Sequence, residues 1–285
     1  MLFGPGFAPP AQSAPQNRKA PMHFTFHPRI GLSDCEPQCN GVIEAVGLVT
    51  GDTPAAFEKL ASAHDLRGAM IVLNSGGGSV LDTLTLGRRW RALGVTTTVG
   101  VAVPLAGRGG ENDKRIAIRP QANCESMCAF LLLAGEQRSV PSGARVRVHQ
   151  IWMGDRADDA KSASYNATDM TTVQRDVGRL AQYTFEMGGS GSLLALALSV
   201  PPWEPLHELS ADELVAANLI TGADGQAMAA NAAAQGRTKA VTERFESDPR
   251  NGDAATVTAE AGRSASGSAV VKDHEPAPRA RATIR

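Results

Sequence analysis

The sequence predicts an α/β fold built around a mostly parallel β-sheet with flanking helices. Segments with strand and helix signals alternate through the middle of the chain, as expected where helices connect parallel strands. Residues 69–73 (AMIVL) form a continuous apolar run, which is typical of a strand covered on both faces. Nearly all Leu, Ile, Trp and Phe residues fall between positions 23 and 222, so we expect one core in that region.

The two ends of the chain differ in composition from this central region. Residues 1–22 are rich in Pro, Ala and Gln, and residues 223–285 contain no Leu, Trp or Tyr and a single Phe. Such segments bury too little apolar surface to offset their chain entropy. We therefore expect a disordered leader over 1–22, a domain over 23–222 and a largely disordered tail, with an Ala-rich helix over 226–235.

Each element of the domain is predicted from its periodicity and its boundary residues. The first half is expected to hold a strand over 41–49, a helix that begins at Asp52-Thr53-Pro54, the strand over 69–73, a helix over 80–93 and a Thr/Val-rich strand over 95–103. Thr53 or Asp52 is placed as the first N-cap, because Pro54 suits the first position of a helix.

The second half continues the alternation. It is expected to hold a short strand around Ile116 and Ile118, a helix over 126–135 ended by Gly135, a strand over 144–149, an amphipathic helix over 169–187 and a helix that follows the capping box 210–213 and ends at Gly222. The strand over 144–149 alternates Val with Arg, which predicts one buried face and one polar face.

Three segments carry residues suited to chemistry, and each lies at the end of an element. The strand over 69–73 leads into Gly76-Gly77-Gly78 and then a helix, and such a turn exposes backbone N–H groups that can hold an oxyanion. Ser126 begins an apolar helix, where serine is most often only an N-cap. His149 lies at the end of a strand, where catalytic groups of α/β folds gather, and His207 is a weaker candidate for the same role.

Taken in order, NSGGGSV at 74–80, CESMCAFLLLAGEQR at 124–138 and ARVRVHQ at 144–150 resemble the proteolytic subunit of the Clp protease and its relatives in the ClpP/crotonase superfamily. The resemblance covers residues 71–222. It implies a ClpP/crotonase-like spiral core and a serine hydrolase, with a peptidase favoured. In that interpretation Ser126 is the nucleophile and His149 the general base. The N–H groups of Gly77 or Gly78 and of Met127 form the oxyanion hole.

Two further features, the cysteines around Ser126 and the helix over 169–187, extend this resemblance. Bacterial ClpP-like proteins often described as periplasmic share the Cys-x-Ser-x-Cys-Ala setting found at 124–129. The helix over 169–187 matches the one that joins rings in Clp peptidases, so the resemblance implies a protruding helix and a homo-oligomer. The resemblance implies a peptide or protein substrate. The motifs do not reveal whether an unfoldase delivers that substrate.

The chain departs from the family pattern in three ways. Gly76 replaces a proline of the glycine turn, and residues 105–121 look like an insertion before the nucleophile. The family's third catalytic residue is an Asp, but the matching stretch 197–209 (ALSVPPWEPLHEL) has none, and Glu204 is the candidate in its place. We expect residues 199–206 to pass close to His149, with Trp203 anchored in the core and Glu204 directed toward water. Such a site would work as a Ser–His dyad or as a weakened enzyme.

Other functions are compatible with parts of this pattern. A catalytically degenerate ClpP-like scaffold would bind peptide without cutting it, and the missing Asp is its main support. A crotonase-like acyl-transfer enzyme shares the fold but has no serine nucleophile at this place. A Ser/Lys hydrolase would need a lysine, and the nearest, Lys161, lies in a polar loop that gives no reason for a depressed pKa.

Composition and motifs limit the cofactors, partners and cellular compartments that we expect for this chain. The formal net charge of −1 gives no basic field for nucleic acid, and no apolar run approaches the roughly 18 residues of a membrane helix. The motifs imply no metal and no organic cofactor. The N-terminus does not resemble a signal peptide, so the chain as written is expected to be cytoplasmic, or periplasmic if its start is misassigned.

The four cysteines form two close pairs in the sequence, Cys35/Cys39 and Cys124/Cys128. Neither pair has the spacing of a zinc finger. We interpret Cys128 as a small buried apolar residue. A disulfide is considered only for Cys35/Cys39, and only in an oxidising compartment.

Overall fold

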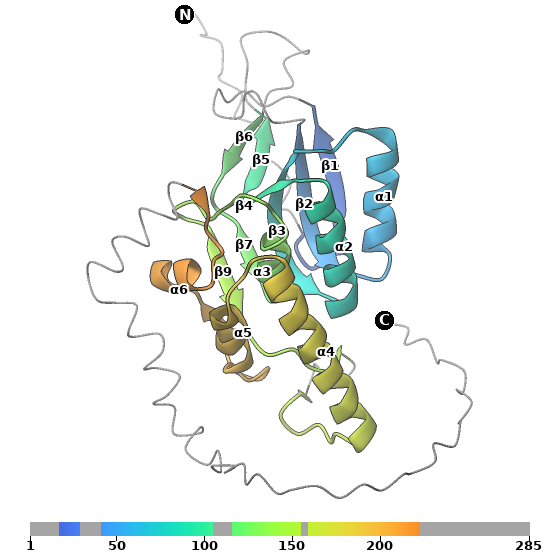
Figure 1. The fold of residues 1–285 in the computed structure, drawn as a ribbon, viewed down its shortest axis with the longest axis vertical. Coiled ribbons are helices and arrows are strands. Elements are labelled where there is room, and N and C mark those ends of the chain that lie inside the picture. The colour runs from blue at the N-terminus through green and yellow to red at the C-terminus, as the bar shows by residue number, and fades with distance from the viewer. Residues whose placement is uncertain (1–16, 29–40, 105–115, 155–158, 223–285) are drawn as a thin grey trace, which may run out of the picture.

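The computed structural model describes residues 17–28, 41–104, 116–154 and 159–222 (Figure 1). The tail over 223–285, with its expected helix, and residues 1–16 of the leader lie outside these ranges. The strands are β1 (His23–His27), β2 (Val42–Val49), β3 (Met70–Gly78), β4 (Thr96–Val99), β5 (Val101–Pro104), β6 (Ile116–Arg119), β7 (Asn123–Glu125), β8 (Arg138–Ser139), β9 (Arg145–Val148) and β10 (His207–Glu208). The helices are α1 (Thr53–Ala63), α2 (Val80–Ala92), α3 (Met127–Leu132), α4 (Ala167–Glu186), α5 (Gly191–Leu198) and α6 (Ala211–Ala216).

The main sheet forks at β3, and the glycines expected to form a turn after this strand are its last residues, 76–78. Its path runs β1-β2-β3-β7-β9-β10, while β4 branches from β3 and pairs with β8. The first half of β3 pairs with β4, and Ser75 in its second half pairs with Cys124 of β7. The pairs β2–β3, β3–β4, β3–β7, β4–β8 and β7–β9 are parallel, which confirms a mostly parallel α/β arrangement.

The core follows from the apolar segments. Ile71, Val72 and Leu73 of β3 are fully buried, as their uninterrupted run predicts, and every residue of α3 is buried. Helix α4 is different, because only Leu180, Tyr183 and Thr184 are buried along its length. Figure 1 shows the N-terminal part of α4 extending below the rest of the described domain.

Several predicted boundaries are wrong for identifiable reasons. The strand expected over 95–103 breaks at Gly100, because β5 turns away to pair with β6, and Ile118 lies where a Cβ at Gly100 would be. The last helix ends at Ala216 rather than Gly222, and Asn218 adopts the left-handed conformation with φ of 57°. Asp52 is the N-cap of α1 and makes no capping bond with its side chain.

The packed chain begins before residue 23. Pro21 forms a bridge to Leu48, and Met22 belongs to the core. Arg18 forms an ion pair with Glu125 at 2.9 Å. The end of the expected leader is therefore attached to the sheet next to β7.

Candidate active site

Ser126 occupies a strained turn between β7 and α3. Its backbone has φ 55° and ψ −124°, and Asn218 is the only other non-glycine residue with positive φ in the described ranges. Such a conformation costs about 1–3 kcal/mol and persists only where its surroundings enforce it. The Ser126 N–H donates to the Arg147 carbonyl at 2.8 Å. A half-buried serine at a sharp strand-to-helix turn is the arrangement that presents a nucleophile in many hydrolases.

The Ser126 side chain does not cap the helix. The residue stands at the N-cap position of α3, but its hydroxyl makes no capping hydrogen bond. The interpretation of Ser126 as a mere N-cap therefore does not account for the hydroxyl, and the strained backbone remains to be explained.

Gly77 lies directly against this turn. A Cβ on Gly77 would lie 2.8 Å from Ser126 Cβ and 2.9 Å from the Met127 nitrogen, and its φ is +91°. Only glycine fits there. The Gly77 N–H donates to the Ser75 hydroxyl at 3.1 Å, which in turn donates to the Gly47 carbonyl. Met127 is the first residue of α3, so its N–H has no partner within the helix.

The structure thus brings Gly77, Ser126 and Met127 together, but the Gly77 N–H expected to hold an oxyanion is engaged by the Ser75 hydroxyl, and Gly78 lies elsewhere. Gly78 lies against β2, where an added Cβ would come within 2.1 Å of the Val49 carbonyl. Its glycine is needed for the close approach of β3 and β2.

His149 follows β9, the strand next to β7. The two strands pair in parallel with Glu125 opposite Arg147. Val146 and Val148 are buried, and because side chains alternate along a strand, Arg147 and His149 lie on the other face. Ser126 and His149 therefore follow the same ends of two neighbouring strands. Among the described contacts, no hydrogen bond joins their side chains, and catalytic pairs without substrate are often loose.

The protonation of the His149 ring is set by its backbone partner. Nδ1 lies 2.8 Å from the Gln150 carbonyl oxygen, which can only accept, so Nδ1 carries the proton and Nε2 keeps its lone pair. The Trp152 ring packs on the imidazole with centroids 4.4 Å apart. Burial lowers the His149 pKa below its ordinary value of 6.5, because the imidazolium loses solvation. The Gln150 hydrogen bond and the Glu125 charge raise the pKa in partial opposition.

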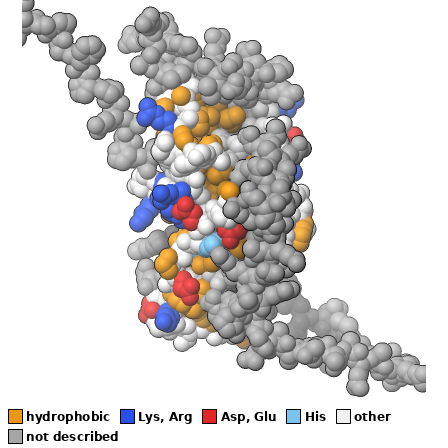
Figure 2. Space-filling view, turned by 90° about the vertical axis from the view of Figure 1, so that its left-hand side faces the viewer, with side chains coloured by type: hydrophobic (Ala, Val, Ile, Leu, Met, Phe, Trp, Pro, Cys, Tyr) orange, Lys and Arg blue, Asp and Glu red, His pale blue; other side chains and the backbone are white. Residues whose placement is uncertain are grey.

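A chain of ion pairs crosses the strands that carry the two residues. Arg147 lies between Glu125 and Glu208, 3.0 Å from each carboxylate, and Glu125 also pairs with Arg18. Figure 2 shows acidic and basic side chains interspersed with apolar ones on the side of the molecule where α6 lies in Figure 1. The network is only partly exposed at Arg147 and Glu125, so it can fix the spacing of β7 and β9.

Glu204, the expected third catalytic group, does not orient the His149 imidazole. The segment over 199–206 does pass beside His149, since the Gln150 N–H donates to the Val200 carbonyl at 2.8 Å. It then turns, with the Glu204 N–H donating to the Pro201 carbonyl, so strand alternation does not apply. Trp203 is 51% exposed, and its expected anchoring in the core is wrong. Glu204 is exposed, as expected, while Gln150 O occupies His149 Nδ1.

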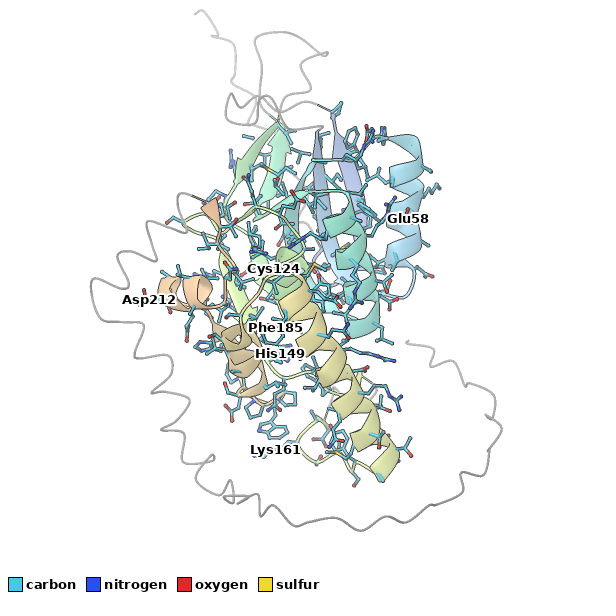
Figure 3. The ribbon with its side chains drawn as sticks, viewed as in Figure 1. Glu58, Cys124, His149, Lys161, Phe185 and Asp212 are labelled. Atoms are coloured by element: carbon cyan, nitrogen blue, oxygen red, sulfur yellow. A yellow bond between two sulfur atoms is a disulfide. The ribbon has the colours of Figure 1, made fainter. Side chains whose placement is uncertain are left out.

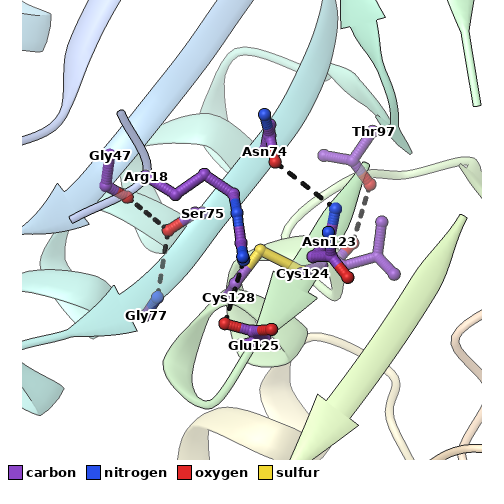
Figure 4. The surroundings of a disulfide bond; sticks show 11 residues. Arg18, Gly47, Asn74, Ser75, Gly77, Thr97, Asn123, Cys124, Glu125 and Cys128 are labelled. Atoms are coloured by element: carbon purple, nitrogen blue, oxygen red, sulfur yellow. Dashed lines mark hydrogen bonds and ion pairs between the residues drawn. A yellow bond between two sulfur atoms is a disulfide. The ribbon is translucent and has the colours of Figure 1, made fainter. Parts of the chain in front are cut away.

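The second cysteine pair corrects another expectation. Cys124 and Cys128 form a disulfide with Cα atoms 5.1 Å apart, so Cys128 is not a free buried thiol. Ser126 lies in the short loop that this bond closes, and Figure 4 shows the bond. Cys35 and Cys39 lie outside the described residues. The sequence spacing of four residues permitted the bond, but only the strand-to-helix turn brings the two Cα atoms within disulfide distance.

The two alternative candidates for the catalytic base are His207 and Lys161. His207 Nε2 lies 3.0 Å from both carboxylate oxygens of Glu213, which engages that nitrogen. Lys161 is exposed, and Figure 3 shows it at the lower end of the molecule, well away from Cys124.

Within the described ranges, no group of three or more His, Cys, Asp or Glu is arranged to hold a metal ion. No helix there is long and apolar enough to cross a membrane.

Comparisons with known proteins add no further assignment. No protein-family model matches the chain. No curated protein matches it at a significant level.

Proposed function

We propose that this chain is a serine hydrolase that cleaves peptide bonds, with Ser126 as nucleophile and His149 as general base. The observation that carries the proposal is the backbone of Ser126, held at positive φ against Gly77 and followed by the first amide of α3, which has no partner within the helix. A structural serine needs no such conformation, whereas a nucleophile that must face both a base and an oxyanion site does.

The residues divide the reaction as follows. His149 Nε2 takes the proton of Ser126 Oγ as the oxygen attacks the substrate carbonyl. The imidazolium that forms keeps its Nδ1–H on the Gln150 carbonyl. The resulting oxyanion is held by the Met127 N–H at the start of α3, because the Gly77 N–H already donates to the Ser75 hydroxyl. His149 then returns the proton to the leaving amine, and water repeats the sequence to release the acyl group.

The substrate class and the family rest on the motif order. NSGGGSV, the Ser126 segment and the His149 segment follow one another as in ClpP-like peptidases, and the fork at β3 that brings the glycine turn to β7 is compatible with a ClpP/crotonase-like core. In this proposal the substrate is a peptide or an unfolded protein segment, and the working form is a homo-oligomer.

A second candidate is a ClpP-like scaffold that binds peptide without cutting it. The exposure of Glu204 favours it, because no carboxylate at that position orients His149. The strained turn at Ser126 favours the enzyme, since a scaffold gains nothing from that strain.

A fluorophosphonate probe tests the two candidates. The hydrolase predicts that wild type becomes labelled at Ser126, that Ser126→Ala abolishes labelling, and that His149→Ala slows it by about 10²-fold or more. Ser142→Ala, in the exposed turn before β9, is the matched serine control and should label like wild type. A wild-type chain that is folded but never labelled supports the scaffold.

A further inference from the structure

The disulfide and the strained serine form one small unit. Cys124 lies in β7 and Cys128 in the first turn of α3, four residues apart, with Ser126 midway between them. Both cysteines are fully buried. Figure 4 shows the bond with Glu125 and its ion pair to Arg18 nearby.

The far end of α3 is held independently of this bond. Arg91 donates to the carbonyls of Leu133 at 2.7 Å and Ala134 at 2.9 Å, and Arg138 donates to Leu133 as well. The side chains of α3 are buried throughout. Loss of the disulfide would therefore free the beginning of α3 and leave its end in place.

At the beginning of α3, two backbone hydrogen bonds hold the Ser126 turn in the described part of the chain. The Ser126 N–H donates to the Arg147 carbonyl, the Ser126 carbonyl accepts from the Ala129 N–H at 3.1 Å, and Gly77 packs against the turn. The Ser126 side chain adds no capping bond. A serine free to relax would return to negative φ, and its hydroxyl would move relative to His149 and the Met127 amide.

We propose that the Cys124–Cys128 disulfide is the positioning element of the nucleophile, and that Ser126 attacks efficiently only while this bond is intact. The inference rests on the proposed hydrolase function. A nucleophile set in this way would be active in an oxidising compartment and weakened where thiols are kept reduced.

Reduction requires an external dithiol. One thiolate of the dithiol attacks a sulfur of the pair, the S–S bond breaks, and a mixed disulfide forms; the second thiolate then closes the oxidised reagent. Two electrons and two protons pass to Cys124 and Cys128, which become thiols. Because both sulfurs lie in the core, the reagent reaches them only when the turn opens.

The test compares two double variants in the full chain. Cys124→Ala/Cys128→Ala removes the bond, and Cys35→Ala/Cys39→Ala removes the other two cysteines as a matched control. We expect the first to label with the fluorophosphonate at least about tenfold more slowly than wild type, since small displacements of a reacting group cost that much or more. The control should label at the wild-type rate.

A second measurement does not depend on catalysis. Amide hydrogen exchange should be at least about tenfold faster at Ser126 and Met127 in the first variant, with α4 and β3 unchanged. A wild type that never labels contradicts the proposed function, and exchange then decides on the disulfide alone. Unchanged exchange there, or equal labelling of wild type and variant, overturns the inference.

If the first variant does not fold, wild type reduced with dithiothreitol replaces it. The labelling rate must fall with the fraction of Cys124 and Cys128 found as thiols by mass, and it must return on reoxidation. A chain that is reduced at both positions and labels at the oxidised rate contradicts the positioning role.

Discussion

His149 donates its Nδ1–H to the carbonyl oxygen of Gln150, the next residue in the chain, across 2.8 Å. In a complete Ser–His–Asp triad a carboxylate holds that nitrogen and stabilises the imidazolium. A carbonyl fixes the same tautomer, but it carries no full charge. The rate of labelling at Ser126 should therefore depend on pH as expected for a Ser–His dyad.

The first prediction concerns this pH dependence. Burial lowers the His149 pKa below 6.5, and the neutral ring is the base in the proposed mechanism, so labelling of Ser126 should be half-maximal at a pH below 6.5. At pH values below the lowered pKa the rate should fall by about tenfold per pH unit. The measurement is the second-order labelling rate across pH. A half-maximal rate above pH 6.5 would indicate a carboxylate partner for His149.

The second prediction separates two neighbouring glycines. Gly77→Ala would place a methyl group against Ser126 Cβ and the Met127 nitrogen at positive φ, so we expect at least a tenfold loss of labelling, on the order of 1.4 kcal/mol in the barrier. Gly76→Ala is the control, because its methyl would meet mainly the flexible end of Leu48 at 3.0 Å. Equal effects of the two substitutions would show that Gly77 has no special relation to the nucleophile.

The third prediction concerns how α4 is attached. The Tyr183 hydroxyl donates to the Phe130 carbonyl and lies 1.9 Å from where a Cβ on Gly87 of α2 would be. Gly87→Ala should lower the free energy of unfolding by about 1–3 kcal/mol, despite the higher helix propensity of alanine.

Gly178→Ala in α4 is the matched control for that substitution. Its Cβ would meet nothing within 4 Å, so propensity alone acts and should stabilise by up to about 1 kcal/mol. Urea unfolding measures both variants. A neutral Gly87→Ala would mean that Tyr183 is not packed against α2.

The buried elements were predictable from the sequence, and the catalytic detail was not. The apolar run in β3, the helix α2 and the Val/Arg alternation of β9 are local patterns, so their positions followed from periodicity. The partner of His149 Nδ1 is a backbone atom, and residue types do not indicate backbone hydrogen bonds. The prediction for Trp203 is wrong because the turn after Pro201 ends the extended chain that this prediction requires.

The disulfide shows a similar limit. Two buried cysteines in an apolar context have the same sequence pattern whether or not they are bonded, and the distance between their Cα atoms depends on the fold. The Ser126 conformation was equally hidden, since serine commonly begins helices at ordinary backbone angles.

The fourth prediction is that the protein self-associates through α4. Phe185 is 64% exposed and Met170 48% exposed on this helix, much of which lies outside the core (Figures 1 and 3). Light scattering should give an oligomer for wild type and a smaller species for Met170→Glu/Phe185→Glu. Leu81→Glu, at a residue of α2 with 47% exposure, is the control and should leave the mass unchanged. A monomeric wild type would contradict the prediction.

The fifth prediction decides the role of Glu204. The residue is exposed in the turn after Pro201, and His149 Nδ1 already donates to Gln150, so a carboxylate at position 204 has no proton to accept from the ring. Glu204→Gln should therefore keep the labelling rate within about twofold of wild type, whereas Ser126→Ala abolishes it. Loss of a true triad carboxylate costs about 10⁴-fold in the serine proteases, so the two outcomes are far apart. A loss of that order in Glu204→Gln, in a chain with wild-type unfolding, would mean that the turn rearranges around substrate and that Glu204 replaces Gln150 as the partner of His149.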